Sequence, residues 1–188
     1  SFRHDSSDAN SLGGSKLETV YADAKGMIWI GFFDGGLDKF NPATGRFTHY
    51  RNLTNDPGSL SPGMVNVILR DHNGTVWVGT ANGLDRFDET NGKFIHYKNE
   101  TANPLSLSSN VVRALYEDHQ GTLWIGTGFP FDRNKPDDGG LNRLEPNGTF
   151  TRFMHDPDNP HSLINNKVRS VFEDSRGVFW VGTGGDGL

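Results

Sequence analysis

The chain has 188 residues, the length of one ordinary domain, and its 11% aromatic content recurs at fixed positions, which argues against disorder. Its formal net charge of −5 gives no basic field for nucleic acid or anionic lipid, and no apolar run reaches the roughly 18 residues of a membrane span. With no cysteine, the chain has neither disulfides nor thiolate sites. We therefore expect no nucleic-acid partner and no membrane contact by this segment.

The predicted elements start with a short tail at about residues 1–10, the end of a preceding repeat, in which residues 2–5 match residues 153–156. A first strand follows at residues 17–21, and equivalent first strands are expected at 65–69, 112–116 and 168–172. Each is apolar and β-prone, and each leads into an Asp-x-x-Gly turn and a second strand that contains tryptophan.

A third strand opens with Gly-Leu, as at Gly36-Leu37, and a fourth follows a turn, as at residues 46–50. Between the fourth strand and the next repeat, a polar loop such as residues 55–60 has the composition of a connection. Each repeat thus predicts four short antiparallel strands, and no segment shows helical periodicity.

The turn and the tryptophan strand recur four times, with tryptophans 48, 47 and 56 residues apart. The repeated residues are Asp23, Asp71, Asp118 and Asp174, then Gly26, Gly74, Gly121 and Gly177, then Trp29, Trp77, Trp124 and Trp180. We interpret them as turn and core residues, because the carboxylate can accept backbone N–H bonds across the turn and the glycine can take a positive φ. Each turn supplies one acid a whole repeat from the next, so we expect no metal site.

First and second strands that are apolar on both faces must be covered on both faces, and stacked four-stranded sheets achieve this in a β-propeller. A β-sandwich is the alternative, but it does not explain a repeat of about 48 residues with the same turn chemistry. We predict an all-β fold of about four antiparallel blades, forming one segment over residues 1–188. The repeats are expected at about 11–58, 59–105, 106–161 and an incomplete 162–188, in a fragment of a larger ring.

The stretch from Val112 to Thr127, with its later Gly140-Leu141, resembles the two-component regulator propeller repeat. That resemblance covers nearly the whole chain and implies the extracytoplasmic sensor domain of a bacterial hybrid histidine kinase. It also implies a location on the periplasmic or extracellular side of the inner membrane, and partners among further blades and signalling domains of a parent chain. The family has no universal ligand motif, so it assigns no binding residue.

The third repeat departs from the others between Thr127 and Gly140, where the chain is about nine residues longer than its counterpart in the second repeat. The candidate ligand-binding residues of this loop are Phe129, Phe131, Asp132 and Arg133, which combine aromatic rings with hydrogen-bonding groups suited to a sugar or peptide. A tolerated surface insertion is the alternative.

One position near the start of the first strand also varies, holding Glu18, Asn66, Arg113 and Arg169 in turn. If this strand lines a central channel, Arg113 and Arg169 can bind a carboxylate or sulfate in a bidentate manner. Salt bridges to neighbouring residues are the alternative for these two side chains.

Six of the seven histidines fall on repeated positions, which indicates scaffold, and no catalytic constellation or phosphate loop stands out. We expect no catalytic residue and no cofactor. The first hypothesis is a sensor that binds a small molecule or oligosaccharide. The alternatives are a propeller enzyme, such as a polysaccharide lyase or hydrolase, and a protein-interaction scaffold, and exposed blade faces would favour a homodimer.

Overall fold

A computed structural model describes residues 2–129 and 138–185, and within these residues the chain forms 14 strands and no helix. It divides into two compact units, Ser1–His96 and Tyr97–Leu188. No helix in the described ranges has the length and apolar character to cross a bilayer. The all-β prediction is confirmed.

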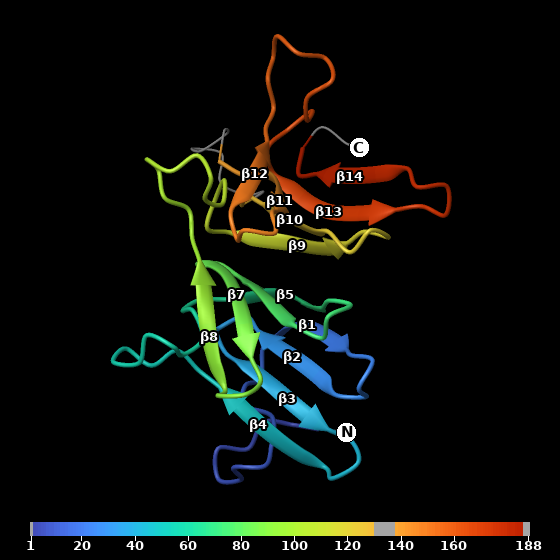
Figure 1. Ribbon diagram of the computed structural model, residues 1–188. Helices are drawn as coiled ribbons and strands as arrows, with labels where there is room; N and C mark the ends of the chain where they lie inside the picture. The colour runs from blue at the N-terminus through green and yellow to red at the C-terminus, as the bar shows by residue number, and fades with distance from the viewer. Residues whose placement is uncertain (1, 130–137, 186–188) are drawn as a thin grey trace. The chain divides into compact units, whose positions relative to one another are not determined.

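The first unit is built from two antiparallel four-stranded sheets in which neighbouring strands follow chain order (Figure 1). Its strands are β1 (Leu17–Ala22), β2 (Ile28–Phe32), β3 (Leu37–Asn41), β4 (Arg46–Tyr50), β5 (Val65–Arg70), β6 (Val76–Thr80), β7 (Gly83–Asp88) and β8 (Lys93–Tyr97). This simple meander has the form of a propeller blade.

The second unit holds one further four-stranded sheet and, among the residues described, a two-stranded one. Its strands are β9 (Val112–Glu117), β10 (Leu123–Thr127), β11 (Gly140–Leu144), β12 (Phe150–Phe153), β13 (Val168–Glu173) and β14 (Phe179–Thr183). The fold class is therefore that of a partial β-propeller.

Each first strand extends one residue beyond the predicted end, because its last residue still pairs with the start of the second strand. Arg70, for example, pairs with Val76 across the turn. The fourth strand predicted at residues 46–50 has the bounds of β4.

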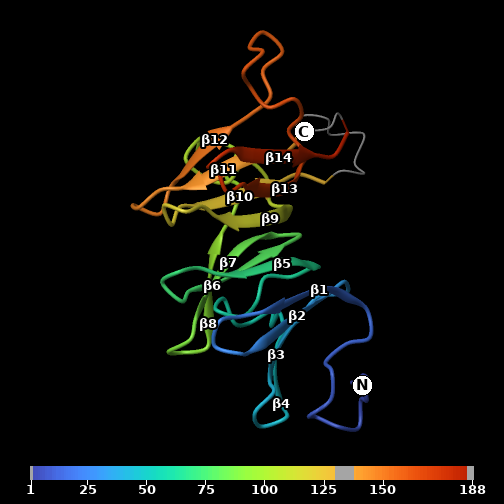
Figure 2. The same cartoon turned by 90° about the vertical axis from the view of Figure 1, so that its right-hand side faces the viewer.

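Within each unit, the first strand of the second sheet packs against the first and second strands of the preceding sheet. β5 covers β1 and β2 in the first unit, and Figure 2 shows β13 beside β9 in the second. Val65 lies on Gly31, where an added Cβ would stand 2.5 Å from its Cγ1, and Val168 lies on Gly126 in the same way at 2.6 Å. A glycine in the second strand thus lets the next sheet approach closely.

The core of the first unit lies between its two sheets, around Trp29, Leu37, Val65 and Ile68. Trp29 is fully buried and its ring meets that of Phe87 edge-on, with centroids 5.6 Å apart. This aromatic packing across the two sheets places Trp29 in the interior. The core prediction does not hold for Trp180, which is 42% exposed on β14.

Candidate ligand-binding site

The repeated turn acid is a structural hub. Oδ1 of Asp23 accepts the backbone N–H groups of Lys25 and Met27, both at 2.9 Å, and Oδ2 accepts the indole N–H of Trp29 at 2.9 Å. Gly26 closes the turn with φ of 76°. The same indole bond joins Trp77 to Asp71, Trp124 to Asp118 and Trp180 to Asp174.

The turn carboxylates are therefore occupied by the scaffold, and no cluster of three or more potential metal ligands is found among the described residues. Burial alone would raise the pKa of Asp118, but hydrogen bonds from Trp124 and the turn amides outweigh it and hold that pKa below its usual value. A group used in this way stays ionised and bonded to its own turn.

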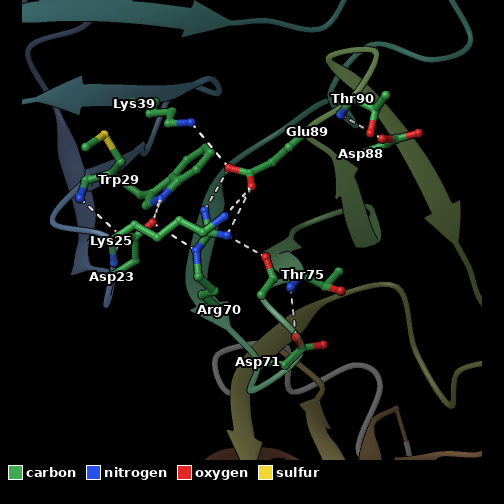
Figure 3. A network of polar contacts seen from close by, with 12 residues as sticks. Asp23, Lys25, Trp29, Lys39, Arg70, Asp71, Thr75, Asp88, Glu89 and Thr90 are labelled. Carbon is green, nitrogen blue, oxygen red and sulfur yellow. Dashed lines mark hydrogen bonds and ion pairs between the residues drawn. The ribbon is translucent and has the colours of Figure 1, made fainter.

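In the first unit this hub also joins the two sheets (Figure 3). The Arg70 side chain is almost fully buried, and its Nε donates to Oδ2 of Asp23 at 2.9 Å while Nη2 donates to Oε1 of Glu89 at 2.8 Å. Lys25 and Lys39 approach the same Glu89 carboxylate at 3.0 and 3.3 Å. These partners, Arg70 first among them, lower the pKa of Glu89 to about 2. The network links the two sheets of the first unit.

The structure brings together a serine, a histidine and an aspartate that the sequence analysis did not connect. Oδ1 of the fully buried Asp85 lies 2.7 Å from Ser61 Oγ and 2.7 Å from His96 Nδ1. Ser61 Oγ also lies 3.0 Å from His96 Nδ1, the nitrogen that faces Asp85, while His96 Nε2 faces the carbonyl of Pro57 at 2.9 Å. In a catalytic triad the serine and the acid face opposite nitrogens of the histidine, and this group does not have that arrangement. Ser61 is itself buried.

Equivalent positions show that this cluster is a repeated loop anchor. In the first repeat, Asp38 accepts the Gly13 N–H at 2.7 Å and pairs with His49 at 2.8 Å. In the third, Asn142 accepts the Ser108 N–H at 2.8 Å. A buried Asp or Asn of the third strand thus ties down the loop that precedes the first strand, whether or not a serine is present.

The variable first-strand position occupies a β-bulge in every repeat. The register shifts between Leu17 and Thr19 in β1, so Glu18 is the extra residue. Asn66, Arg113 and Arg169 are the extra residues at the corresponding shifts in β5, β9 and β13. A bulge re-aims its side chain and is frequent beside functional sites. The scaffold therefore presents one variable side chain per repeat at the start of its first strand.

In the second unit the long loop starts and ends beside these bulges. The N–H of Gly128 donates to the Val111 carbonyl at 2.9 Å, two residues before Arg113. An added Cβ on Gly128 would stand 3.1 Å from the Cα of Lys167, and one on Gly139 would stand 2.2 Å from the Asn166 carbonyl. Both ends of the loop are thus packed against the segment that leads into Arg169.

Of the predicted candidates, Arg113 and Arg169 lie near the starts of the neighbouring strands β9 and β13, close in the chain to the residues that the ends of the loop contact. Arg113 is half-buried and Arg169 exposed, and Phe129, at the start of the loop, is 37% exposed. Phe131, Asp132 and Arg133 lie outside the described residues. Two arginines on neighbouring strands, beside a loop that begins with an aromatic residue, suit an anionic ligand with apolar faces.

A family model described as "Two component regulator propeller" matches residues 59–82, 106–129 and 162–185. Each match contains a first strand, its turn and its tryptophan strand. A search of curated proteins finds no significant match.

Among solved structures, the chain is similar to the extracellular domain of a putative hybrid two component system from B. thetaiotaomicron, with 24% identity and a TM-score of 0.71 over 94% of this chain and 21% of that one. A second such domain from the same organism gives 23% identity and a TM-score of 0.58 over 99% of this chain and 28% of that one. The chain thus spans 21% and 28% of the lengths of these two domains.

The fold is also shared with an enzyme. A catalytically inactive virginiamycin B lyase from Staphylococcus aureus is 15% identical with a TM-score of 0.61, over 88% of this chain and 48% of that one. At this identity the similarity shows the fold alone.

Proposed function

Because this chain carries the repeats of the two component regulator propeller family, we propose that it is a ligand-sensing segment of a bacterial membrane-bound two-component sensor. In this proposal the segment binds a soluble oligosaccharide on the periplasmic or extracellular side of the inner membrane and leaves it chemically unchanged. The sensor-domain neighbours support the setting, and the site geometry supports the binding role.

The observation that carries the proposal is that the two ends of the long β10–β11 connection lie against the segments that lead into two bulged arginines. The second repeat connects β6 to β7 through Ala81 and Asn82 alone, so the blade does not need the longer loop. The bulge position likewise changes from Glu18 to Arg169 while the register shift stays the same. A repeated scaffold can change its ligand specificity when the side chain at one position varies and the backbone there stays the same.

The chemistry favours an acidic sugar. A guanidinium can bind a carboxylate through two parallel hydrogen bonds, which fixes orientation as well as adding energy. Phe129, which is 37% exposed and follows Gly128 in the long connection, provides an aromatic surface. The Ser61, His96 and Asp85 group gives no support to an enzyme, since its histidine is bonded on both nitrogens to the scaffold.

As partners we propose further propeller repeats and signalling domains of a parent chain, since this segment spans only 21% of its sensor-domain neighbour. We also propose self-association to a homodimer through exposed apolar residues. Val20 is 60% exposed on β1, and Trp180 is 42% exposed on β14. Apolar faces of this kind mark interaction surfaces.

The test is calorimetric titration of the chain with defined acidic and neutral oligosaccharides. We expect the Arg113→Ala and Arg169→Ala variants to lose about tenfold or more in affinity for the acidic ligand. Deletion of residues 129–138 should weaken binding and leave the fold intact. Arg176→Ala is the matched control, because Arg176 is an exposed arginine in the turn at the opposite end of β13.

Chromatography of the ligand after long incubation checks for turnover. Cleavage of any oligosaccharide would replace the sensor proposal with the enzyme alternative. Equal affinities of the wild-type chain and both arginine variants would show that the ligand does not bind at Arg113 and Arg169.

A further inference from the structure

Phe33 interrupts the repeat in a way that the scaffold does not require. It follows the last residue of β2, where the other repeats have Ala81, Gly128 and Gly184. It is nevertheless 53% exposed, so a large apolar ring replaces a methyl group or hydrogen and faces solvent. A single exposed apolar residue is common on protein surfaces, so exposure by itself assigns no role.

The backbone at this position is the same with or without the ring. The Phe33 N–H donates to the Lys16 carbonyl at 2.8 Å, and the N–H groups of Ala81, Gly128 and Gly184 make the equivalent bond at 2.9, 2.9 and 2.8 Å. Three repeats thus form the same connection with no side chain larger than methyl. The ring of Phe33 is therefore not needed for folding of the loop.

Two backbone hydrogen bonds close the loop that carries Phe33. The Phe32 N–H donates to the Gly36 carbonyl at 3.1 Å, and the Gly35 N–H returns to the Phe32 carbonyl at 3.3 Å. Gly35 and Gly36 have φ of 92° and 114°, which side chains other than glycine rarely adopt. Phe32 is fully buried, with the Arg51 guanidinium 5.6 Å from its ring centroid. One phenylalanine anchors the loop while the next is displayed.

Charged residues lie near Phe33, together with the exposed Leu17. Its backbone bond places it beside Lys16, and Glu18, the bulged residue of β1, lies two positions farther along. Lys16, Glu18 and the adjacent Asp34 are all exposed. An aromatic face next to charged hydrogen-bonding groups is suited to a pyranose ring, whose C–H face stacks on the aromatic ring while its hydroxyls bond the rim.

We propose that Phe33 is the stacking platform of a sugar-binding subsite in the first unit, at the start of β1. This inference rests on the proposed function, because it takes the ligand to be an oligosaccharide. Because the backbone that carries the ring is already hydrogen-bonded, it needs little ordering when the sugar binds. Its ligand is a pyranose unit with its apolar face on the ring.

The experiment titrates the chain with tetra- to hexasaccharides of galacturonic acid and of glucose, with wild-type and variant proteins in parallel. We expect Phe33→Ala to weaken binding about tenfold or more and Phe33→Trp to keep it within about threefold. Ile95→Ala is the control, because Ile95 is an exposed apolar residue on the outer strand β8. It should bind as the wild type does.

Thermal unfolding separates binding from folding, since an exposed ring should leave the midpoint unchanged. If the wild type binds a sugar and Phe33→Ala binds it equally well, Phe33 does not form a sugar subsite, and the proposed function stands. If Phe33→Trp loses as much affinity as Phe33→Ala, the ring does not act by stacking on the sugar. If the wild type binds no member of either series, both the proposed function and this inference are overturned.

Discussion

The indole N–H of Trp29 donates to Oδ2 of Asp23 across 2.9 Å, and the bond recurs at the same six-residue spacing in all four repeats. The acid before the turn thereby fixes the largest side chain of the following strand. Because Oδ1 of the same carboxylate holds two turn amides, one residue joins turn geometry to core packing.

Asp118→Ala should lower the free energy of unfolding by about 1–3 kcal/mol, because it leaves Trp124 Nε1 and the amides of Gln120 and Thr122 without their acceptor. Urea unfolding monitored by circular dichroism measures the change. Asp158→Ala, in an exposed loop of the same unit, should change stability by less than about 0.5 kcal/mol. Equal effects of the two substitutions would contradict the role of Asp118 as a hub.

The turns could be predicted because their chemistry is local. Gly74 lies three residues after Asp71, and its φ of 84° is the conformation that the spacing indicates. The bond from Trp77 to Asp71 was not predicted, since it depends on how a side chain on the second strand points back across the turn. Its constant spacing is the signal that could have revealed it.

The non-local parts of the site could not be derived from the sequence. Ser61, Asp85 and His96 come from a loop, a third strand and a fourth strand, so their meeting depends on strand register. The sequence shows Arg113 only as a variable position. Its bulge could not be predicted, because a strand with one extra residue has the same kind of apolar sequence as a regular strand. Phe33 lies one residue beyond the repeated stretch, which ends at Phe32, so the motif carries no signal for it.

Asp85→Ala should cost about 3–5 kcal/mol, because it removes the buried acceptor of Ser61 and His96. Repeat three shows a tolerated alternative, with Asn142 at the acid position and Arg152 at the histidine position. We therefore expect the double substitution D85N/H96R to be more stable than Asp85→Ala. Chemical unfolding of the three proteins decides, and a double variant no more stable than Asp85→Ala would contradict the proposed exchange.

Arg152 explains how that exchange works in the third repeat. Its Nε donates to the Ser106 carbonyl at 2.7 Å and its Nη2 to the Asn103 carbonyl at 2.9 Å. The arginine thus holds the loop directly through its carbonyls, while Asn142 bonds the Ser108 N–H as Asp85 bonds that of Ser61. Asp–His and Asn–Arg are two ways of anchoring the same loop.

Gly126→Ala should destabilise the second unit by about 1–3 kcal/mol, because the new methyl group would stand 2.6 Å from Cγ1 of Val168. Val168→Ala removes that methyl and costs stability by itself, since Val168 is fully buried. The double variant should lose less than the sum of the two single changes. Additive losses in a double-mutant cycle would show that the two sheets do not meet at this contact.

Acid should weaken the junction of the first two sheets through Glu89. Hydrogen bonds from Arg70, with Lys25 and Lys39 adding to them, lower the pKa of Glu89 from about 4.5 to about 2 in the folded protein. A depressed pKa contributes stability that is fully present above the unfolded value and is lost as the pH falls through the folded value. The contribution of Glu89 should therefore decline between about pH 4.5 and pH 2.

Glu89→Gln should accordingly reduce the unfolding free energy most above pH 4.5, and the difference from the wild type should shrink toward zero near pH 2. Unfolding in urea across this range gives the profile. Arg70→Met is the matched background, because it removes the partner whose two nitrogens reach Glu89. In the Arg70→Met background, Glu89→Gln should change the unfolding free energy much less. The same pH profile in both backgrounds would mean that Arg70 does not keep Glu89 ionised.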